Sequence, residues 1–367
     1  MADLSQVVPA LAAGLGVALP GTGEVGPELQ CPDIQHAFVC LIDGLGDSLL
    51  GDHESDAPFL ASGRRSAIDT VFPTTTPTAL ASLGMGQLPG MHGLVGASFL
   101  LPETGRVLSP LSWGDDPSPL AVQPEPTMFE RLADAGVDVR TVSAAAYAQS
   151  GLTRSVLRGS AYVPAEDVDD RLRALEAMDW GSGRSFTYVY WPHLDRTGHE
   201  HGCGSPQWRA RLREADLLVR GIVERMPPRA ALIVTADHGM VNCPEQDRIP
   251  LDSEPSLLAD VELIAGEPRA RHVYARAGAA GDVARRWEER LGGVARVYTR
   301  GQLVDSGLLG DVEEFAAERI GDVVAVCDGT ASLASSVDPR VSALLGQHGA
   351  LTLEELRVPA VRFETTA

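Results

Sequence analysis

Seven side chains in this 367-residue chain are candidates to hold metal ions or to attack an ester, because of their types and their positions in the sequence. They are three aspartates, three histidines and one threonine, namely Asp43, Thr76, Asp195, His199, Asp237, His238 and His348. Carboxylates and imidazoles are ordinary ligands of zinc-like cations. Two adjacent dications stabilise the entering and leaving oxygens of an in-line displacement at phosphorus, and they ease deprotonation of a hydroxyl. The set therefore predicts a two-ion site for phosphoryl chemistry, and ligands without cysteine suit zinc, with manganese or iron as alternatives.

Taken singly, each of these residues also has an ordinary structural explanation. Asp195 and His199 lie four residues apart, so both can reach one ion from a single loop or helical turn. The same spacing occurs in surface turns with a solvated histidine. Asp43 fits a turn or helix cap, and Thr76 fits a simple capping threonine. The argument for a site therefore depends on the elements that carry these residues.

Three apolar runs, at 37–42, 186–190 and 231–235, are predicted to be strands of a parallel sheet. Asp43 and Asp237 follow the first and third runs, and Asp195 follows the second a few residues later. The carboxyl ends of parallel strands fall on one edge of a sheet, where open α/β proteins bind ligands. We therefore expect the three acids to meet at that edge.

The segment after residue 72 is predicted to bring a hydroxyl to a helix terminus. Thr76 before Pro77 fits the N-cap position, with proline in the first turn of a helix that runs on to Leu83. Backbone N–H groups at such a terminus are free, and the helix dipole is positive there. This arrangement suits an alcohol that attacks a phosphoryl group.

The order of predicted elements indicates an α/β fold with an insertion. Helix, glycine and strand alternate through the first two thirds of the chain, which is the pattern of a mostly parallel sheet flanked by helices. The composition changes between about 244 and 325, where a small β-α-β unit is predicted. We therefore expect a catalytic core of residues 1–243 and 326–367, and an inserted subdomain of residues 244–325 that shapes or covers the site.

Composition limits the partners and the compartment. The formal charge is −20, and all 30 basic residues are arginine, so long nucleic acid is an unsuitable partner, although bound dications would still admit small anions. A mean hydropathy of −0.01, without an apolar run near the ~20 residues that span a bilayer, predicts a soluble protein without a membrane partner. Five scattered cysteines without a CxxC pair argue against disulfides and thiolate zinc clusters, and predict a reducing cytoplasm. The N-terminal apolar stretch lacks a basic flank and is predicted to be a helix and loop, not a signal peptide.

The candidate residues lie in motifs whose order resembles a known family. The motifs are Leu-Ile-Asp43-Gly-Leu, Phe72-Pro-Thr-Thr-Thr76, Leu-Pro-Gly-Met-His92-Gly, Asp195-Arg-Thr-Gly-His199, Thr-Ala-Asp237-His238-Gly and His348-Gly. From about residue 36 to 350 the chain resembles the alkaline phosphatase superfamily, and within it the type I phosphodiesterase/nucleotide pyrophosphatase branch. The resemblance implies an alkaline-phosphatase-like, mostly parallel central sheet flanked by helices, with a small α+β inserted subdomain.

The resemblance also implies roles for the seven residues. One zinc ion would be held by Asp195, His199 and His348. A second would be held by the remaining ligands, Asp43, Asp237 and His238, together with Thr76. Thr76 would be the nucleophile that is covalently phosphorylated or nucleotidylated.

One departure from the branch concerns the phosphoryl oxygens. An asparagine that helps to bind them in nucleotide pyrophosphatases is replaced here by Ala97. The ions, backbone N–H groups near Thr76, or another side chain must then take its role. Arg154 and Arg196 are the candidates for such a side chain.

The leading hypothesis is a di-zinc hydrolase of phosphodiester or nucleotide pyrophosphate bonds in a small phosphate-ester or nucleotide substrate. The covalent intermediate would form on Thr76. An alternative with the same metals is a phosphomonoesterase or a phosphonate-cleaving hydrolase. An alternative of another class is a catalytically silent binding protein of this fold, which the complete set of ligands and nucleophile disfavours. The physiological substrate and the oligomeric state are not readable from these residues.

Overall fold

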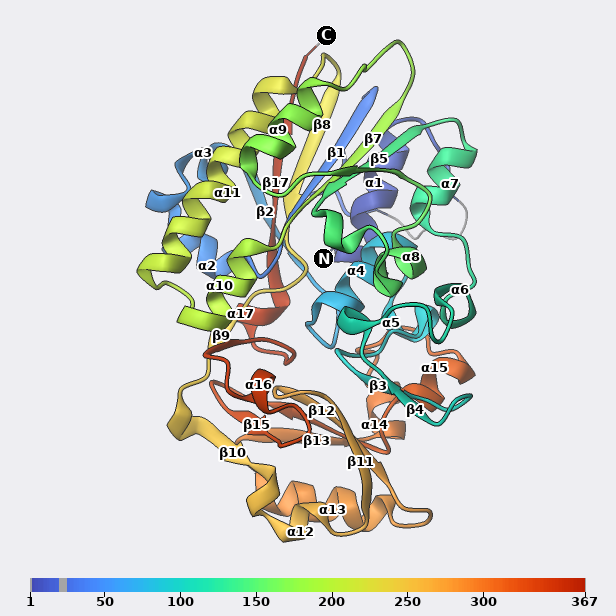
Figure 1. Cartoon of the computed structure of the whole chain (residues 1–367), viewed down its shortest axis with the longest axis vertical. Coiled ribbons are helices and arrows are strands. Elements are labelled where there is room, and N and C mark those ends of the chain that lie inside the picture. The colour runs from blue at the N-terminus through green and yellow to red at the C-terminus, as the bar shows by residue number, and fades with distance from the viewer. Residues whose placement is uncertain (1, 20–24, 367) are drawn as a thin grey trace.

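A seven-stranded, mostly parallel sheet forms the centre of the molecule (Figure 1). The computed structural model describes residues 2–19 and 25–366. Across the sheet the strands are β2 (Arg64–Asp69), β17 (Arg357–Glu364), β8 (Ala230–Thr235), β1 (His36–Ile42), β7 (Ser185–Trp191), β5 (Asp138–Ser143) and β6 (Ala161–Pro164). The five strands from β8 to β6 are parallel, whereas β17 runs antiparallel to both β8 and β2. The predicted α/β fold is confirmed.

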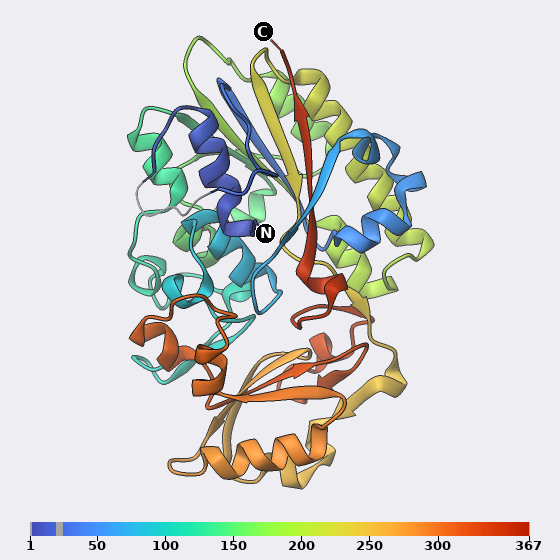
Figure 2. The same cartoon turned by 180° about the vertical axis from the view of Figure 1, so that it is seen from behind.

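Helices cover both faces of this sheet, which explains why its central strands are apolar without alternation. Every residue of β1 and of β8 is buried, as expected for strands packed on both sides. Figures 1 and 2 show α9 and α11 along one side of the sheet and α1 and α4 along the other. The helices of this part are α1 (Val7–Gly14), α2 (Asp47–Asp52), α3 (Pro58–Ser62), α4 (Thr76–Met85), α5 (Pro89–His92), α6 (Pro119–Val122), α7 (Met128–Asp134), α8 (Gly151–Val156), α9 (Val168–Glu176), α10 (His193–His201), α11 (Pro206–Arg225) and α17 (Leu353–Leu356).

A second, smaller unit lies below the sheet in Figure 1. Its four-stranded sheet has the order β11 (Val261–Glu267), β12 (Ala270–Ala275), β14 (Val323–Cys327) and β13 (Ala295–Thr299), and all of its pairs are antiparallel. It has a separate hydrophobic core, in which Trp287 and Leu291 of α13 (Ala280–Leu291) pack with Val273 and Val323. We call this unit, from Arg248 to Ala334, the cap region.

The cap region extends further along the chain than predicted. The expected end at residue 325 falls inside β14, which belongs to the small sheet. After it, β15 (Ser332–Ala334) pairs in parallel with β10 (Arg248–Pro250). The chain therefore leaves the small sheets only after Ala334. The other elements are α12 (Pro255–Leu258), α14 (Arg300–Asp305), α15 (Glu314–Arg319), α16 (Pro339–Ser342) and the strand pairs β3 (Phe99–Leu101) with β4 (Arg106–Leu108) and β9 (Val241–Asn242) with β16 (Gly346–Gln347).

The described residues show neither a disulfide nor a helix suited to a membrane. All five cysteines are free, and four of them, Cys31, Cys40, Cys243 and Cys327, are buried. No helix in the described ranges combines the length and the apolar character needed to cross a bilayer.

A buried ion pair joins the cap region to the segment that follows His348. Arg269 lies in the turn between β11 and β12, and its Nε and Nη2 donate to the two carboxylate oxygens of Glu355 at 2.7 and 2.6 Å. Both side chains are fully buried. Glu355 also accepts hydrogen bonds from the Ala350 N–H at 3.0 Å and the Thr352 hydroxyl at 2.7 Å. The pair is thus part of a satisfied network that fixes the turn against the C-terminal segment.

We expect Arg269→Met to lower the free energy of unfolding by about 3–5 kcal/mol, because it leaves the Glu355 carboxylate buried without its cation. Arg285→Met is the matched control, since Arg285 is exposed and its ion pairs among the described residues are with Asp282 and Glu289 on the surface of α13. Urea unfolding of both variants measures the difference. Equal stability of the two variants would show that the buried pair does not hold the cap region in place.

Candidate metal centre and nucleophile

Strand register brings the candidate acids to one edge of the large sheet. In β1, Ile42 lies opposite Trp191 of β7, and Leu41 lies opposite Thr235 of β8. The three strands therefore end together. Asp43 directly follows β1, Asp237 follows β8 after Ala236, and the chain after β7 turns into α10, which carries Asp195. The expected meeting of the acids at this edge is present in the structure.

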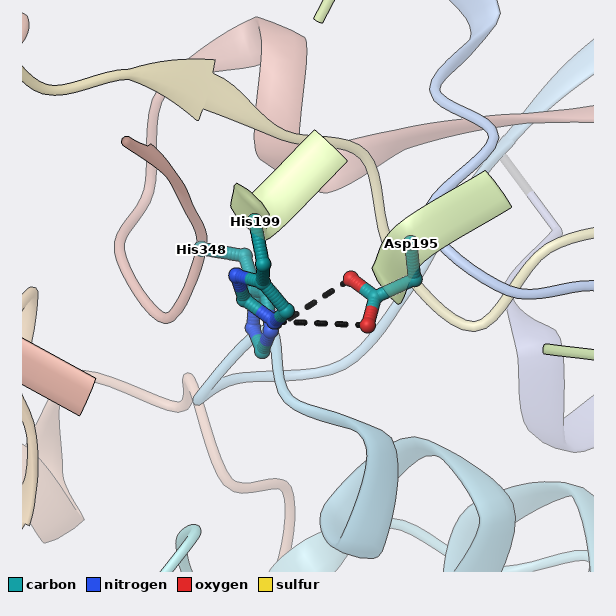
Figure 3. Close-up of side chains that lie close together, drawn as sticks. All are labelled: Asp195, His199 and His348. Atoms are coloured by element: carbon teal, nitrogen blue, oxygen red, sulfur yellow. Dashed lines mark ion pairs between the residues drawn. The ribbon is translucent and has the colours of Figure 1, made fainter. Parts of the chain in front are cut away.

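The six candidate metal ligands form two neighbouring clusters. Asp195, His199 and His348 are one group, and their ligand atoms lie within 4.8 Å of one another (Figure 3). The other group consists of Asp43, Asp237 and His238, under the same distance limit. The rings of His238 and His348 stack with centroids 3.7 Å apart, so the clusters adjoin. We call them the Asp195 cluster and the Asp43 cluster.

Distances within the clusters suit shared cations. His199 Nε2 is 3.3 Å from Asp195 Oδ2, and His348 Nε2 is 3.9 Å from Asp195 Oδ1. In the Asp43 cluster, His238 Nε2 lies 3.6 Å from Asp43 Oδ1 and 3.5 Å from an oxygen of Asp237. Imidazole and carboxylate ligands of a zinc-type ion approach each other to about this separation, because each is ~2 Å from the ion.

Unsatisfied oxygens provide a test of whether the clusters fit metal ions. One buried oxygen each of Asp43, Asp195 and Asp237 has no hydrogen-bond partner among the described residues. Buried carboxylate oxygens are normally paired, and an unpaired buried charge is costly. All three oxygens lie in the two clusters, where cations would supply the missing interaction. The residues therefore fit a two-ion centre.

Carbonyl groups fix the orientation of the three histidines. The Nδ1 atoms of His199, His348 and His238 lie 2.7, 2.9 and 3.1 Å from the carbonyl oxygens of Gly346, Thr74 and Gly239. A carbonyl only accepts hydrogen bonds, so each Nδ1 carries the proton and donates. Nε2 then faces the carboxylates as the ligand atom, which is the usual outer-shell arrangement of metal-bound histidine.

The protonation of the ligands follows from burial and from their neighbours. Burial, together with the charges of Asp237 and Asp195, raises the pKa of Asp43 well above its usual range. Burial opposes protonation of His199, but the Asp195 carboxylate outweighs it and raises the pKa of His199 to about 9. A metal ion that binds here at neutral pH must therefore displace the proton of His199, so that metal affinity rises with pH.

Thr76 lies at the start of α4 and beside the Asp43 cluster. Its Oγ1 is 3.2 Å from His238 Nε2. The predicted N-cap role is wrong by one residue, because Thr75 is the N-cap and Thr76 is the first helical residue. Thr75 has the extended backbone that a cap requires, with φ −137° and ψ 145°, whereas its side chain makes no capping hydrogen bond. The Thr76 hydroxyl nevertheless lies at the helix terminus that the sequence indicated.

Two cavities open beside the clusters. The first, of about 290 Å³, reaches Asp43, Thr76 and Asp195, and four tyrosines and several leucines line it. The second, of about 380 Å³, reaches His199 and His348 between the core and the cap region. Leu111 lines both cavities. We call them the tyrosine cavity and the cap cavity.

Two further residues of the site were missed by sequence reasoning. The Tyr190 hydroxyl donates to Asp43 Oδ2. The sequence could have indicated this residue, because side chains alternate between the two faces of a strand and Tyr190 lies near the end of the strand before Asp195. Glu267, at the end of β11, is buried, with its Oε2 3.4 Å from His348 Nδ1. Burial raises the pKa of Glu267 well above its usual range. Nothing in the sequence near Glu267 indicated its place, because the cap region brings it there.

Other residues that the sequence singled out have different positions. Arg154 pairs with Asp115 on the surface and does not line either cavity. Arg196 is exposed and lines the tyrosine cavity. Ala97 lines the cap cavity. His92 is buried with its Nε2 2.9 Å from the Ser82 hydroxyl, which is a structural contact of α4.

Comparisons with known proteins identify the family and support the fold. The family model described as type I phosphodiesterase/nucleotide pyrophosphatase matches residues 37–351. A murine ectonucleotide pyrophosphatase/phosphodiesterase 5 structure has a TM-score of 0.70 at 18% identity, covering 88% of this chain and 87% of that one. A phosphonoacetate hydrolase from Sinorhizobium meliloti, in complex with phosphonoformate, has a TM-score of 0.69 at 19% identity, covering 92% of each chain. These two likenesses concern the fold.

We expect His199→Ala to reduce bound zinc from about two ions to about one per chain, because the Asp195 cluster loses a ligand. His201→Ala is the matched control, since His201 is exposed on the same helix and, within the part of the chain that the structure describes, pairs with Glu200. Elemental analysis of dialysed protein measures the stoichiometry. Equal zinc contents in the two variants would remove His199 from the ligand set.

Proposed function

The chain belongs to the type I phosphodiesterase/nucleotide pyrophosphatase family, and on this premise we propose that it is a di-zinc hydrolase of phosphodiester or nucleotide pyrophosphate bonds, with a covalent intermediate on Thr76. Family membership makes it an enzyme of the phosphoric ester hydrolase class. The observation that carries the finer proposal is the position of Thr76 Oγ1, 3.2 Å from His238 Nε2 and at the floor of the tyrosine cavity.

The chemistry proceeds in two displacements. Bound zinc ions would lower the pKa of the Thr76 hydroxyl and stabilise charge on the entering and leaving oxygens. Thr76 Oγ, having lost its proton to solvent, forms a bond to phosphorus while the opposite ester oxygen leaves with the bonding electrons and takes a proton from water. A water molecule then attacks the phospho-threonine ester on the same axis and restores the threonine, with phosphate monoester as the product.

The N-terminus of α4 supports the transferring phosphoryl group. Backbone N–H groups in the first turn of a helix have no partner within the helix, and the dipole favours negative charge beside them. Thr76 occupies that turn of a ten-residue helix. These groups take over part of the role of the asparagine that Ala97 replaces, because preorganised donors stabilise the charge that develops in the transition state.

The surroundings favour diesters over monoesters. A phosphomonoester carries two negative charges on its free oxygens and needs a basic side chain to pair with the second. The described residues that line the two cavities include one arginine, Arg196, and it is exposed. A diester has a single charge and two substituents, and a cavity lies on each side of the clusters to receive them.

We expect zinc-loaded protein to hydrolyse bis-p-nitrophenyl phosphate faster than p-nitrophenyl phosphate. Thr76→Ala should lower turnover of the diester by at least about a thousandfold, since the nucleophile is lost, while zinc content stays at the wild-type level. Thr76→Ser keeps the hydroxyl and should retain measurable turnover. Preference for the monoester would move the enzyme to the phosphatase alternative, and full activity of Thr76→Ala would exclude Thr76 as the nucleophile.

A further inference from the structure

The two cavities receive different halves of a diester if the proposed function holds. In an in-line displacement the leaving oxygen lies opposite the attacking oxygen. Thr76 is beside the Asp43 cluster, so the leaving oxygen lies toward the Asp195 cluster. Two of the three members of that cluster, His199 and His348, line the cap cavity, whereas the tyrosine cavity is lined by Thr76 and Asp43 and, of that cluster, by Asp195 alone. The leaving group therefore enters the cap cavity, and the retained substituent occupies the tyrosine cavity.

The cap cavity contains hydroxyl groups and acids but no basic residue apart from the two histidine ligands. Its polar lining comes from side chains of both the core and the cap region: Thr75, Ser98, Ser109, Ser112, Glu267, Asp338 and Gln347. The lining includes no arginine, and the protein has no lysine. The Asp338 carboxylate is already paired, since Arg271, which does not line the cavity, donates from Nη1 to its Oδ2 at 2.5 Å.

Glu267 provides the observation that points to a ligand. Its exposed fraction is 5%, and its Oε1 has no hydrogen-bond partner among the described residues. A buried polar atom without a partner costs free energy, and a native structure normally gives such an atom one. Whether or not the carboxyl group carries a proton, Oε1 can exchange a hydrogen bond with a hydroxyl or accept one from an ammonium group. In neither state does it bring a positive charge to the cavity.

We propose that the cap cavity is a leaving-group subsite that accepts a neutral or cationic alcohol and disfavours pyrophosphate. Pyrophosphate beyond the scissile bond would bring several negative charges into a partly enclosed space beside Glu267 and Asp338. Apart from the ion that His199 and His348 would hold, the lining offers no cation to pair with these additional charges, and a buried charge without a partner is strongly unfavourable. An alcohol brings no such charge, and its hydroxyl or ammonium groups satisfy the polar lining. The site therefore discriminates by penalising the wrong leaving group, and simple diesters are preferred over nucleoside triphosphates.

Insertion of a positive charge into the cap cavity tests this selection. The two substrates are the p-nitrophenyl ester of thymidine 5′-phosphate and thymidine 5′-triphosphate, which share the retained nucleoside and differ in the leaving group. Ser112→Arg places a guanidinium in the lining, at an exposed position that has no structural role beyond a 3.3 Å hydrogen bond to the Ser109 carbonyl. The ratio of kcat/KM for triphosphate to that for the ester should rise on the order of tenfold, because a cation then pairs with the leaving pyrophosphate.

Matched variants isolate the effect of position. Ser118→Arg adds the same charge to the same surface segment at a residue that does not line the cavity, and its ratio should equal that of the wild type. Ser109→Arg is a second insertion into the lining and should reproduce the rise. Zinc content and the melting temperature of each variant establish that it is folded and loaded.

The outcomes separate this inference from the proposed function. Turnover of both substrates with an unchanged ratio in both cavity variants would overturn the leaving-group subsite and leave the hydrolase standing. Preference of the wild type for the triphosphate would also overturn it. Failure of zinc-loaded wild type to cleave either substrate would overturn the proposed function, and the subsite with it.

Discussion

Three carboxylates gathered at one buried edge of a sheet are the constraint on which the rest of this structure depends. Parallel register places the ends of β1, β7 and β8 side by side, and this brings Asp43, Asp195 and Asp237, which follow these ends, close together. Each retains a buried oxygen without a hydrogen bond. Mutual repulsion and desolvation of these carboxylates are unfavourable without cations, so the fold makes this edge of the sheet suited to metal ions.

The central elements were predictable from sequence because buried parallel strands carry an unambiguous signal. The runs His36–Ile42 and Ala230–Thr235 are apolar on both faces, and each is followed by an acid and a glycine-containing turn. The same signal misplaced the end of the cap region. β14 is as uniformly buried as β1 and β8 of the large sheet, and burial alone does not tell which sheet a strand joins. That choice depends on pairing with β12 and β13, which are distant in sequence.

The residues of the two clusters were predictable as a set for a different reason, which is that metal chemistry restricts residue types. One aspartate or histidine after a buried strand has ordinary structural uses, but several of them at neighbouring strand ends indicate a shared site, whereas tyrosine and glutamate carry no such signal. Tyr190 touches Asp43 because alternation along β7 turns it toward the edge of the site. Glu267 reaches His348 across a sequence separation that only the docking of the cap region closes. Residues whose role comes from docking leave no local pattern in the sequence.

The turn between β11 and β12 shows how the cap region can alter selectivity without altering chemistry. Over four residues it makes three separate contacts with the core: the Gly266 N–H donates to the Ser98 carbonyl at 2.9 Å, Glu267 adjoins His348, and Arg269 pairs with Glu355. Arg269 is anchored by a buried bidentate ion pair with Glu355. Because Glu267 lies only two residues before Arg269, this anchor restricts where Glu267 can lie in the lining of the cap cavity. The candidate metal ligands on that side, His199 and His348, come from the core and keep their own carbonyl contacts. Substitutions in the turn and the neighbouring wall can therefore change which leaving group fits, while the two clusters and Thr76 retain their geometry.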